Sequence, residues 1–391
     1  MIKTIRVMLC PNNKQKTKLF QYANTARFAY NWALEKEQEN HKNGGKFISD
    51  GDLRKEFTKL KKTDKYAWLN EVSNNVTKQA VKDACDAYKR FFKGLSKFPR
   101  FKSRKYSTPG FYQDNIKIQF TDTHVKVEGF AVSKKKNKQK MNWIRLAEHG
   151  RIPTNGKYTN PRIKFDGINW WITVGIEAEE ITVHPSNEGM GIDLGIKNLA
   201  VCSDKNKYKN INRIQKVKKL EKRKRRLQRS LSRRYEQNKK GESYCKTGNI
   251  VKREKELLKL NHRLTNIRQN HLHQTTSKII KREPSFICME DLNVKGMMKN
   301  RHLSKAVQQQ SFGEFRRQME YKAMWNNIPV IFADRFFPSS KLCSCCGKIK
   351  KDLKLNDRVY KCKCGNVIDR DDQASLNLKR YGEMSLEQSV S

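Results

Sequence analysis

Four cysteines near the C-terminus have the type and spacing of metal ligands. They are Cys343, Cys346, Cys362 and Cys364. Thiolates spaced in this way bind Zn²⁺ tetrahedrally in a zinc ribbon, although the second pair is one residue shorter than the common Cys-x2-Cys. Cys345 could replace Cys346 as a ligand. We favour Cys346, because Gly347 directly after it permits the backbone turn. Four thiolates leave no position for water, so this zinc ion would be structural.

Three carboxylates, far apart in the sequence, could hold the metal ions of a nuclease. Asp193 lies within an apolar run, Glu290 directly follows one, and Asp371 opens a segment with helical spacing. Hydrolysis of a phosphodiester at neutral pH needs an activated water and a stabilised leaving oxygen, which two divalent ions about 4 Å apart supply. Mg²⁺ prefers oxygen ligands and keeps several waters. We therefore predict that these three residues are catalytic and bind Mg²⁺, as two ions.

Each carboxylate has other interpretations when taken singly. An acidic residue at a strand end is often a cap or a surface charge. The segment Gly191-Ile-Asp-Leu-Gly195 also resembles the phosphate loop of actin-like sugar kinases, but the second Asp-x-Gly-Gly-type loop of that class is not found. RNase H-like folds place an Asp within the first strand, a Glu at the end of a later strand and an Asp on a C-terminal helix. The three carboxylates follow that order.

The composition indicates a polyanionic partner. The 391 residues include 84 Lys and Arg against 39 Asp and Glu, a net charge of +45. This excess exceeds what solubility needs and favours nucleic acid, with a generally basic surface or an anionic membrane as the alternatives. No apolar run is long enough to span a membrane, and the N-terminus has no signal-peptide core. We expect a cytoplasmic, nucleoid-associated prokaryotic protein.

The elements that must position these residues follow from hydrophobic periodicity. A strand is expected at residues 3–9, helices at 14–40 and 75–95, and short strands at 116–120, 125–127, 143–146, 162–165 and 170–176. From residue 187 the pattern becomes α/β, with strands at 190–194, 199–203, 286–289 and 330–333. The tail after Tyr381 is predicted to fray.

A helical hairpin is predicted between the second and third of these strands, at residues 211–280. Its apolar residues recur every three or four positions on both arms, with Gly241 and Gly248 at the bend. Residues 213–240 contain fourteen Lys or Arg and two Glu. A charged stretch is usually a solvated face, but this imbalance would repel itself without a counter-charge, so we predict that the first arm faces nucleic acid.

The motifs resemble those of TnpB, a compact RNA-guided nuclease encoded by insertion sequences and a relative of the type V CRISPR effectors. The resemblance covers essentially the whole chain and is most specific near its end. It depends on Gly191-Ile-Asp-Leu-Gly-Ile-Lys-Asn-Leu-Ala200, Met289-Glu-Asp-Leu292, Pro338-Ser-Ser-Lys-Leu-Cys-Ser-Cys-Cys-Gly347 and Cys364-Gly-Asn-Val-Ile-Asp-Arg-Asp-Asp-Gln-Ala374. Phe98-Pro-Arg-Phe-Lys-Ser103 also resembles the connector of the family.

The resemblance implies a multidomain α+β fold. A wedge-like β-barrel would comprise residues 1–12 and 106–186, with a helical recognition domain, 13–105, inserted into it. An RNase H-like (RuvC-like) α/β nuclease domain would comprise 187–342 and 366–391, interrupted by a zinc ribbon at 343–365.

The resemblance also implies partners and ligands. These are a guide RNA from the transposon end, a double-stranded DNA target beside a short target-adjacent motif, and Mg²⁺-dependent cleavage. Carried over by motif, the metal ligands are Asp193, Glu290 and Asp371, and Asp369 and Asp372 are disfavoured. Gln373, where the family usually has Asn, and the short Cys-x-Cys knuckle are departures that remove no ligand.

Three hypotheses follow. The first is an RNA-guided, divalent-metal-dependent DNA endonuclease, monomeric with one RNA. The second is a nuclease-silent RNA-guided repressor, which the intact carboxylates disfavour. The third is a strand-transfer transposase on the same fold, which would act as a multimer without a guide. No single-sequence motif identifies the residues that would read the target-adjacent motif.

Overall fold

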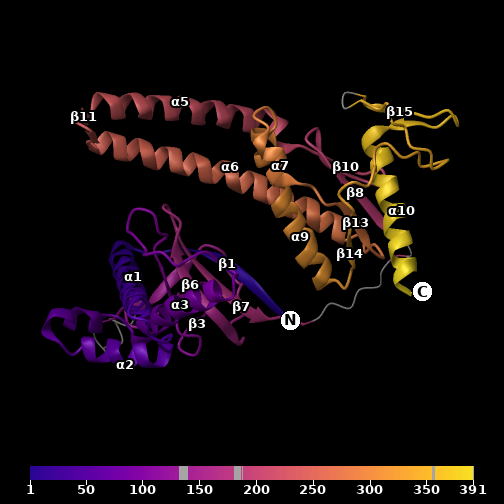
Figure 1. Ribbon diagram of the computed structural model, residues 1–391. Helices are drawn as coiled ribbons and strands as arrows, with labels where there is room; N and C mark the ends of the chain where they lie inside the picture. The colour runs from indigo at the N-terminus through magenta and orange to yellow at the C-terminus, as the bar shows by residue number, and fades with distance from the viewer. Residues whose placement is uncertain (132–139, 180–185, 187, 355–356, 391) are drawn as a thin grey trace. The chain divides into compact units, whose positions relative to one another are not determined.

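The computed structural model describes residues 1–131, 140–179, 186, 188–354 and 357–390. They form two compact units that divide after Glu179. The elements of both are labelled in Figure 1. No helix among the described residues is long and apolar enough to cross a membrane.

The first unit contains a seven-stranded antiparallel sheet in the order β2-β6-β7-β1-β5-β4-β3. Its strands are β1 (Ile2–Cys10), β2 (Gly110–Tyr112), β3 (Gln119–Phe120), β4 (His124–Lys126), β5 (Trp143–Leu146), β6 (Tyr158–Phe165) and β7 (Trp170–Glu177). The N-terminal strand pairs with β7 along its length and with β5 at Leu9 and Cys10. The order is open, with β2 and β3 at its ends, and the predicted barrel closure is not among the described pairings.

One predicted strand is shorter than expected. Of residues 116–120, Gln119 and Phe120 form β3. The segment before them turns instead, because the Asp114 carboxylate accepts hydrogen bonds from the backbone N–H groups of Ile116 and Lys117. Such Asx turns compete with strand pairing.

The helices of the first unit lie between β1 and β2 in sequence. They are α1 (Asn13–Lys42), α2 (Asp50–Leu60), the 3₁₀ helix η1 (Asp64–Glu71) and α3 (Asn74–Phe92). A capping box between Asn12 and Gln15 starts α1. Alanines line the buried face of α1, and together with Leu19 and Tyr22 they allow α3 to pack closely. The predicted helical segment between the strands is therefore present.

The second unit contains a five-stranded sheet in the order β10-β9-β8-β13-β14. Its strands are β8 (Met190–Leu194), β9 (Asn198–Cys202), β10 (Lys207–Lys209), β13 (Ile287–Glu290) and β14 (Val330–Ala333). The first three are antiparallel, whereas β8, β13 and β14 run parallel. The carboxyl ends of β8 and β13 therefore lie at the same edge of the sheet.

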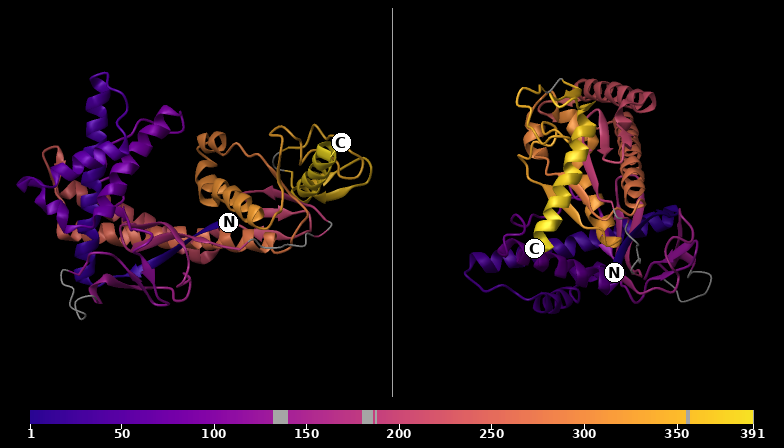
Figure 2. Two further views of the ribbon diagram at one scale, coloured as in Figure 1. Left: turned by 90° about the horizontal axis from the view of Figure 1, so that it is seen from below. Right: turned by 90° about the vertical axis from the view of Figure 1, so that its right-hand side faces the viewer.

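Helices cover both faces of this sheet (Figure 2). On one face, Met190 and Ile192 of β8 pack with residues of α6 (Gly248–Ile280) and α9 (Phe312–Trp325). On the other, Cys288 of β13 packs with Leu378 of α10 (Arg370–Val390). Shorter helices α7 (Val294–Lys299) and α8 (Ser304–Gln310) precede α9.

The predicted hairpin is present. After the 3₁₀ turn η3 (Ile211–Arg213), α5 (Gln215–Gln237) and α6 run antiparallel, joined by β11 (Lys239–Lys240) and β12 (Ser243–Tyr244). The two long helices lie side by side in Figures 1 and 2. Only Val217 and Leu227 of α5 are buried, so most of this helix is exposed.

The predicted fraying after Tyr381 is wrong, because α10 continues to Val390. Its later turns have partners in the sheet. Gly382 lies so close to Phe286 that a Cβ atom would collide with the ring, and Leu386 packs on the same apolar cluster. Burial of this apolar contact stabilises the continued helix.

Candidate active site and metal centre

The pleat of the central sheet brings two predicted carboxylates to one face. Side chains alternate along a strand, so Gly191 and Asp193 of β8 point to the same face, as do Cys288 and Glu290 of β13. The parallel register pairs Cys288 with Gly191 and Met289 with Ile192, which sets Glu290 beside Asp193 at the edge. This is the face that α10 covers.

Gly191 allows α10 to approach this face at backbone distance. A Cβ atom at Gly191 would collide with the Ser375 carbonyl oxygen and the Lys379 nitrogen of α10. Because Ser375 lies one turn after Asp371, the close contact places the first turn of the helix over Asp193. Asp371 is in that first turn, where the partial positive charge of a helix N-terminus favours a carboxylate.

Asp193 is buried and lies within the electrostatic influence of both other carboxylates. Burial, followed by the charges of Glu290 and Asp371, raises the pKa of Asp193 well above its usual range. Burial also raises the pKa of Glu290, although a hydrogen bond from Ser339 and the charge of Arg370 act in the opposite direction. Buried like charges that destabilise one another are the setting in which a bound cation is most favourable.

Two residues at this site were not identified from the sequence. The buried Ser339 hydroxyl donates a hydrogen bond to Glu290 Oε1, and the Ser339 carbonyl accepts one from Asn377 of α10 at 2.7 Å. Lys207 Nζ lies 2.7 Å from an Asp372 oxygen and 3.9 Å from one of Asp369. No local sequence pattern identifies Ser339 or Lys207 as a site residue, because each contacts its partner through long-range packing.

The neighbouring acidic residues are engaged elsewhere. Asp291 forms ion pairs with Arg316 and Arg335, both at 2.6 Å, and the hydrogen bonds from these guanidinium groups lower its pKa. Asp372 pairs with Lys207, while Asp369 accepts a hydrogen bond from the Asp371 backbone at 3.0 Å. These contacts leave Asp371 as the member of its motif whose charge acts on Asp193 most strongly.

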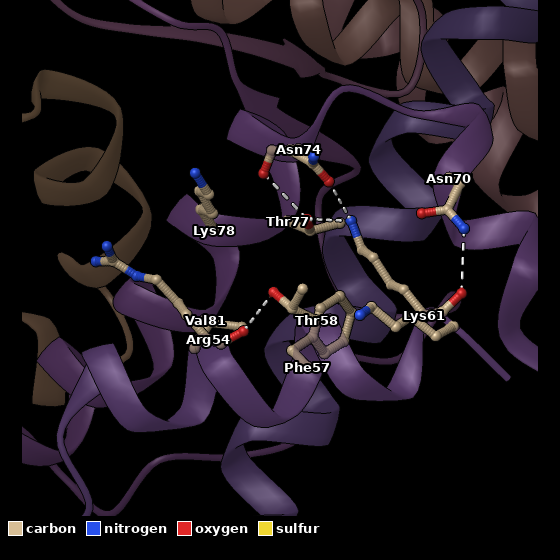
Figure 3. Close-up of a pocket in the computed structure, with 10 residues that line it drawn as sticks. Arg54, Phe57, Thr58, Lys61, Asn70, Asn74, Thr77, Lys78 and Val81 are labelled. Atoms are coloured by element: carbon tan, nitrogen blue, oxygen red, sulfur yellow. Dashed lines mark hydrogen bonds between the residues drawn. The ribbon is translucent and has the colours of Figure 1, made fainter.

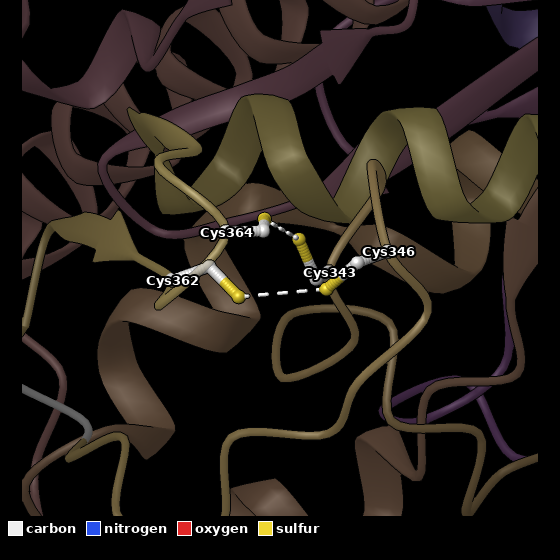
Figure 4. Close-up of side chains that lie close together, drawn as sticks. All are labelled: Cys343, Cys346, Cys362 and Cys364. Atoms are coloured by element: carbon white, nitrogen blue, oxygen red, sulfur yellow. Dashed lines mark hydrogen bonds between the residues drawn. The ribbon is translucent and has the colours of Figure 1, made fainter.

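The four predicted cysteines come together in the structure (Figure 4). Their four sulfurs lie within 4.8 Å of one another, and among the described residues they are the one group of three or more His, Cys, Asp or Glu side chains placed to hold a metal ion. Cys343 and Cys364 are 3.6 Å apart at sulfur, as are Cys346 and Cys362. A tetrahedron with Zn–S bonds of about 2.3 Å needs sulfurs about 3.8 Å apart. The group includes Cys346 and not Cys345.

Local backbone geometry forms this centre. Each cysteine pair is followed by a glycine with positive φ, Gly347 at 70° and Gly365 at 91°, as tight turns require. The second pair lies in the turn between β15 (Val359–Lys361) and β16 (Val367–Asp369). Burial opposes ionisation of the Cys343 thiol, but hydrogen bonds from backbone N–H groups and Asn366 outweigh it and lower its pKa to about 6.

The cysteine centre is tied directly to α10. Gln373 is fully buried and donates to the Leu342 carbonyl at 2.5 Å. Its own amide oxygen accepts hydrogen bonds from Ser344, at 3.0 Å, and from Asn366, at 3.3 Å. Asp371 lies two residues before Gln373. The conformation of the cysteine loops and the position of the Asp371 carboxylate therefore depend on each other.

A basic pocket of about 390 Å³ lies among α2, η1 and α3 of the first unit (Figure 3). Its lining includes Arg54, Lys61, Lys62 and Lys78. Lys61 is buried and donates to Asn74, at 2.7 Å, and to Thr77, at 3.0 Å, and no carboxylate in the described part of the chain pairs with it. Burial lowers the pKa of Lys61 to about 8. The pocket is suited to an anion.

Comparison with known proteins identifies the family. A relative in Streptomyces pristinaespiralis, named "Putative RNA-guided DNA endonuclease", is 30% identical over 95% of this chain and 87% of its own length. The chain belongs to the TnpB family. The resemblance drawn from the motifs is therefore confirmed.

Other comparisons agree with membership of the TnpB family. The Escherichia coli K12 protein named "Putative RNA-guided DNA endonuclease InsQ" is 27% identical over 92% of this chain and 87% of its own. Family models match at residues 1–46 ("Helix-turn-helix domain"), 172–301 ("Probable transposase") and 312–378 ("Cas12f1-like, TNB domain"). The fold is similar to a Cas12f1 chain solved with sgRNA and target DNA, with a TM-score of 0.61, 13% identity and 97% and 98% of the two chains covered.

The raised pKa of Asp193 predicts how the metal-free TnpB chain responds to pH. The Asp193 carboxyl binds its proton more tightly in the folded chain than in the unfolded chain. Its contribution to folding stability is therefore full below the unfolded pKa, near 4, and is lost as the pH rises through the folded pKa. We expect Asp193→Asn to raise the melting temperature by a few degrees at pH 7.5 in EDTA, and by less at pH 4. Thermal unfolding followed by circular dichroism would measure this, and a lower melting temperature at pH 7.5 would contradict it.

Proposed function

We propose that this TnpB-family chain is an RNA-guided, divalent-metal-dependent DNA endonuclease whose catalytic residues are Asp193, Glu290 and Asp371. The proposal is supported by the register that carries Asp193 and Glu290 to one sheet edge, and by the close approach there of α10, whose first turn contains Asp371. Burial raises the pKa of Asp193, and the charges of Glu290 and Asp371 raise it further. The strand order and the Asp, Glu, Asp sequence agree with an RNase H-like nuclease domain. The names of the two relatives support the same activity.

The donor set fits Mg²⁺. Carboxylate oxygens are its preferred ligands, and mutual repulsion of buried carboxylates is relieved by a cation. Bound Mg²⁺ would activate water and stabilise the leaving oxygen. In this arrangement Ser339 fixes the orientation of Glu290, and Arg370 supplies positive charge beside Asp193 and Glu290.

The cysteine centre fits a structural zinc ion. The ligands would be Cys343, Cys346, Cys362 and Cys364, which are all thiols and leave no open coordination position. The match of residues 312–378 to a Cas12f1-like domain model supports a separate small module here. Its role would be to hold the start of α10, through Gln373, where Asp371 meets the sheet.

The basic surfaces fit guide RNA and target DNA. On α5, Lys218, Lys222, Arg225 and Arg229 are exposed on one face and have no ion pair among the described residues. The anion pocket around Lys61 fits a backbone phosphate of the duplex that flanks the target. In this class of complex the protein contacts backbone and a short flanking motif, while base pairing reads the sequence.

The exposed face of α5 predicts the salt dependence of RNA binding. We expect the triple variant Lys218→Gln, Lys222→Gln, Arg225→Gln to reduce the slope of log Kd against log salt by about 2, at ~0.7 per lost contact to single-stranded phosphate. The matched control removes three charges from α6, at Lys252, Lys255 and Lys259, which are also exposed. Filter binding across a salt series would measure the slope for both variants. If the α5 variant and the α6 variant gave equal slopes, α5 would have no special role in RNA binding.

The hydrogen bond between Ser339 and Glu290 predicts a smaller catalytic effect. We expect Ser339→Ala to lower kcat about tenfold, because the Glu290 carboxylate loses its orienting donor. The Mg²⁺ concentration for half-maximal rate should rise as well. Ser385→Ala is the control, because the Ser385 hydroxyl on α10 donates to the Tyr381 carbonyl of the same helix. Unchanged kinetics in Ser339→Ala would remove this residue from the proposed site.

The proposal is tested by purifying the chain with RNA transcribed from its own locus and adding a plasmid library with randomised flanks in Mg²⁺. Cleavage beside an enriched short motif would support it. Tight RNA and target binding without cleavage would favour a nuclease-silent repressor. A strand-transfer transposase is the other candidate, because the model matching residues 172–301 is described as "Probable transposase". It would join DNA ends without a guide, and this would overturn the proposal.

A further inference from the structure

A second cavity in the first unit combines aromatic rings with cations. It has a volume of about 410 Å³ and lies between α1, η1 and the connector that follows α3. Its lining comprises Arg27, Phe28, Asn31, Trp32, Glu35, Tyr66, Lys102 and Arg104. This volume is within the range of small-ligand sites, about 300–1,000 Å³. The anion pocket around Lys61 shares none of these residues.

The aromatic wall is held in place by the core. Phe28 and Trp32 are half-buried and pack against the hydrophobic cluster of the unit. The Trp32 ring meets Phe57 edge-on at 5.0 Å, and Phe28 lies 5.8 Å from Tyr66. Because α1 repeats every 3.6 residues, positions 28 and 32 share one face with Arg27 and Asn31. These rings are therefore ordered before any ligand arrives.

The connector is fastened to the same face of α1. Asn31 donates to the Lys102 carbonyl at 2.9 Å and accepts from the Lys102 backbone N–H at 2.8 Å. The Lys102 ammonium lies 3.5 Å from the centre of the Tyr30 ring. This anchoring brings Arg104 to the cavity, although Lys102 lies 71 residues after Asn31 in the chain. The sequence analysis found that Phe98–Ser103 resembles the connector of the family, but it did not assign the segment a site.

The cavity has an excess of positive charge. Arg27 and Arg104 have no ion pair among the described residues, and the one carboxylate in the lining is Glu35. Arginine binds phosphate through paired N–H donors, and aromatic faces bind unstacked bases. Glu35 can accept a hydrogen bond from a sugar hydroxyl or from a base N–H. The arginines, the aromatic rings and the Glu35 carboxylate together match the phosphate, the base and the sugar of one nucleotide.

We infer that this cavity, which we call the Trp32 pocket, binds a single unpaired nucleotide of RNA, with its base against Phe28, Trp32 or Tyr66 and its phosphate on Arg27 and Arg104. This inference rests on the proposed function for the presence of RNA. Duplex nucleic acid does not fit, because its bases are stacked within the helix and cannot reach aromatic side chains. RNA is favoured over DNA because Glu35 offers an acceptor to the 2′-hydroxyl.

Photocrosslinking tests the Trp32 pocket. The full chain is mixed with an unstructured fifteen-nucleotide RNA containing 5-iodouridine, irradiated, digested and mapped by mass spectrometry. We expect adducts on Phe28, Trp32 or Tyr66, and at least a fivefold lower yield with Arg27→Ala, Arg104→Ala. The matched control, Lys14→Ala, Lys16→Ala, removes two exposed cations from α1 outside the pocket and should leave the yield unchanged. Circular dichroism establishes that both variants are folded.

The outcomes separate this inference from the proposed function. Adducts confined to other residues, or equal yields in the two double variants, would overturn the pocket, and guided cleavage by the same preparation would leave the nuclease proposal intact. An iodo-deoxyuridine DNA of the same sequence that crosslinks equally well would overturn the assignment to RNA. Absence of both RNA binding and guided cleavage would instead contradict the proposed function.

Discussion

Asp193→Ala is expected to reduce guided DNA cleavage by ~10³-fold or more while leaving RNA binding within a factor of two. Asp193 is buried, and burial together with the charges of Glu290 and Asp371 raises its pKa. Its loss would remove one of the three proposed metal ligands. The proposed RNA contacts lie on the basic surfaces, so RNA binding should not change.

The matched control for this prediction is Asp291→Asn. Asp291 is adjacent to Glu290 but forms ion pairs with Arg316 and Arg335. We expect this variant to retain cleavage within about threefold, since exposed ion pairs contribute little. Single-turnover cleavage of a plasmid target and filter binding of the RNA would be measured for both variants. Persistent cleavage by Asp193→Ala would mean that the site is wrongly assigned.

Cys346→Ser is expected to have the next largest effect, on both stability and cleavage. Structural zinc contributes ~10–16 kcal/mol of binding free energy in zinc-finger peptides, so loss of one ligand should cost on the order of 3 kcal/mol or more in the second unit. The damage should reach the carboxylates, because Gln373 bonds to Leu342 and Ser344 beside the cysteine loops. We expect cleavage to fall at least a hundredfold.

Cys345→Ser provides a control that differs by one position. Cys345 is exposed and outside the group of four sulfurs. The wild type and Cys345→Ser should each contain about one zinc per chain by mass spectrometry, and Cys346→Ser much less. Thermal unfolding and cleavage would be followed in parallel. Zinc loss in Cys345→Ser with retention in Cys346→Ser would reverse the ligand assignment, and full cleavage without zinc would separate the centre from the active site.

Sequence reasoning predicted the cysteine group that the structure brings together, and it proposed the three carboxylates, because both predictions depend on short-range patterns. Two cysteine pairs each followed by glycine, and acidic residues at the ends of apolar runs, can be recognised without knowing how the chain packs. The central strands 190–194 and 330–333 also coincide with β8 and β14, since alternation and apolar runs are local properties. The TnpB resemblance used the same local motifs.

The arrangement of these residues was decided by tertiary structure. Nothing local to Asp193 shows that Gly191 admits α10, that Ser339 reaches Glu290 or that Lys207 holds Asp372. The continuation of α10 past Tyr381 and the Trp32 pocket likewise depend on contacts between segments far apart in the chain. The sequence alone therefore determined which chemical groups this protein has. Strand register and helix packing, which depend on the whole fold, decided which of those groups meet.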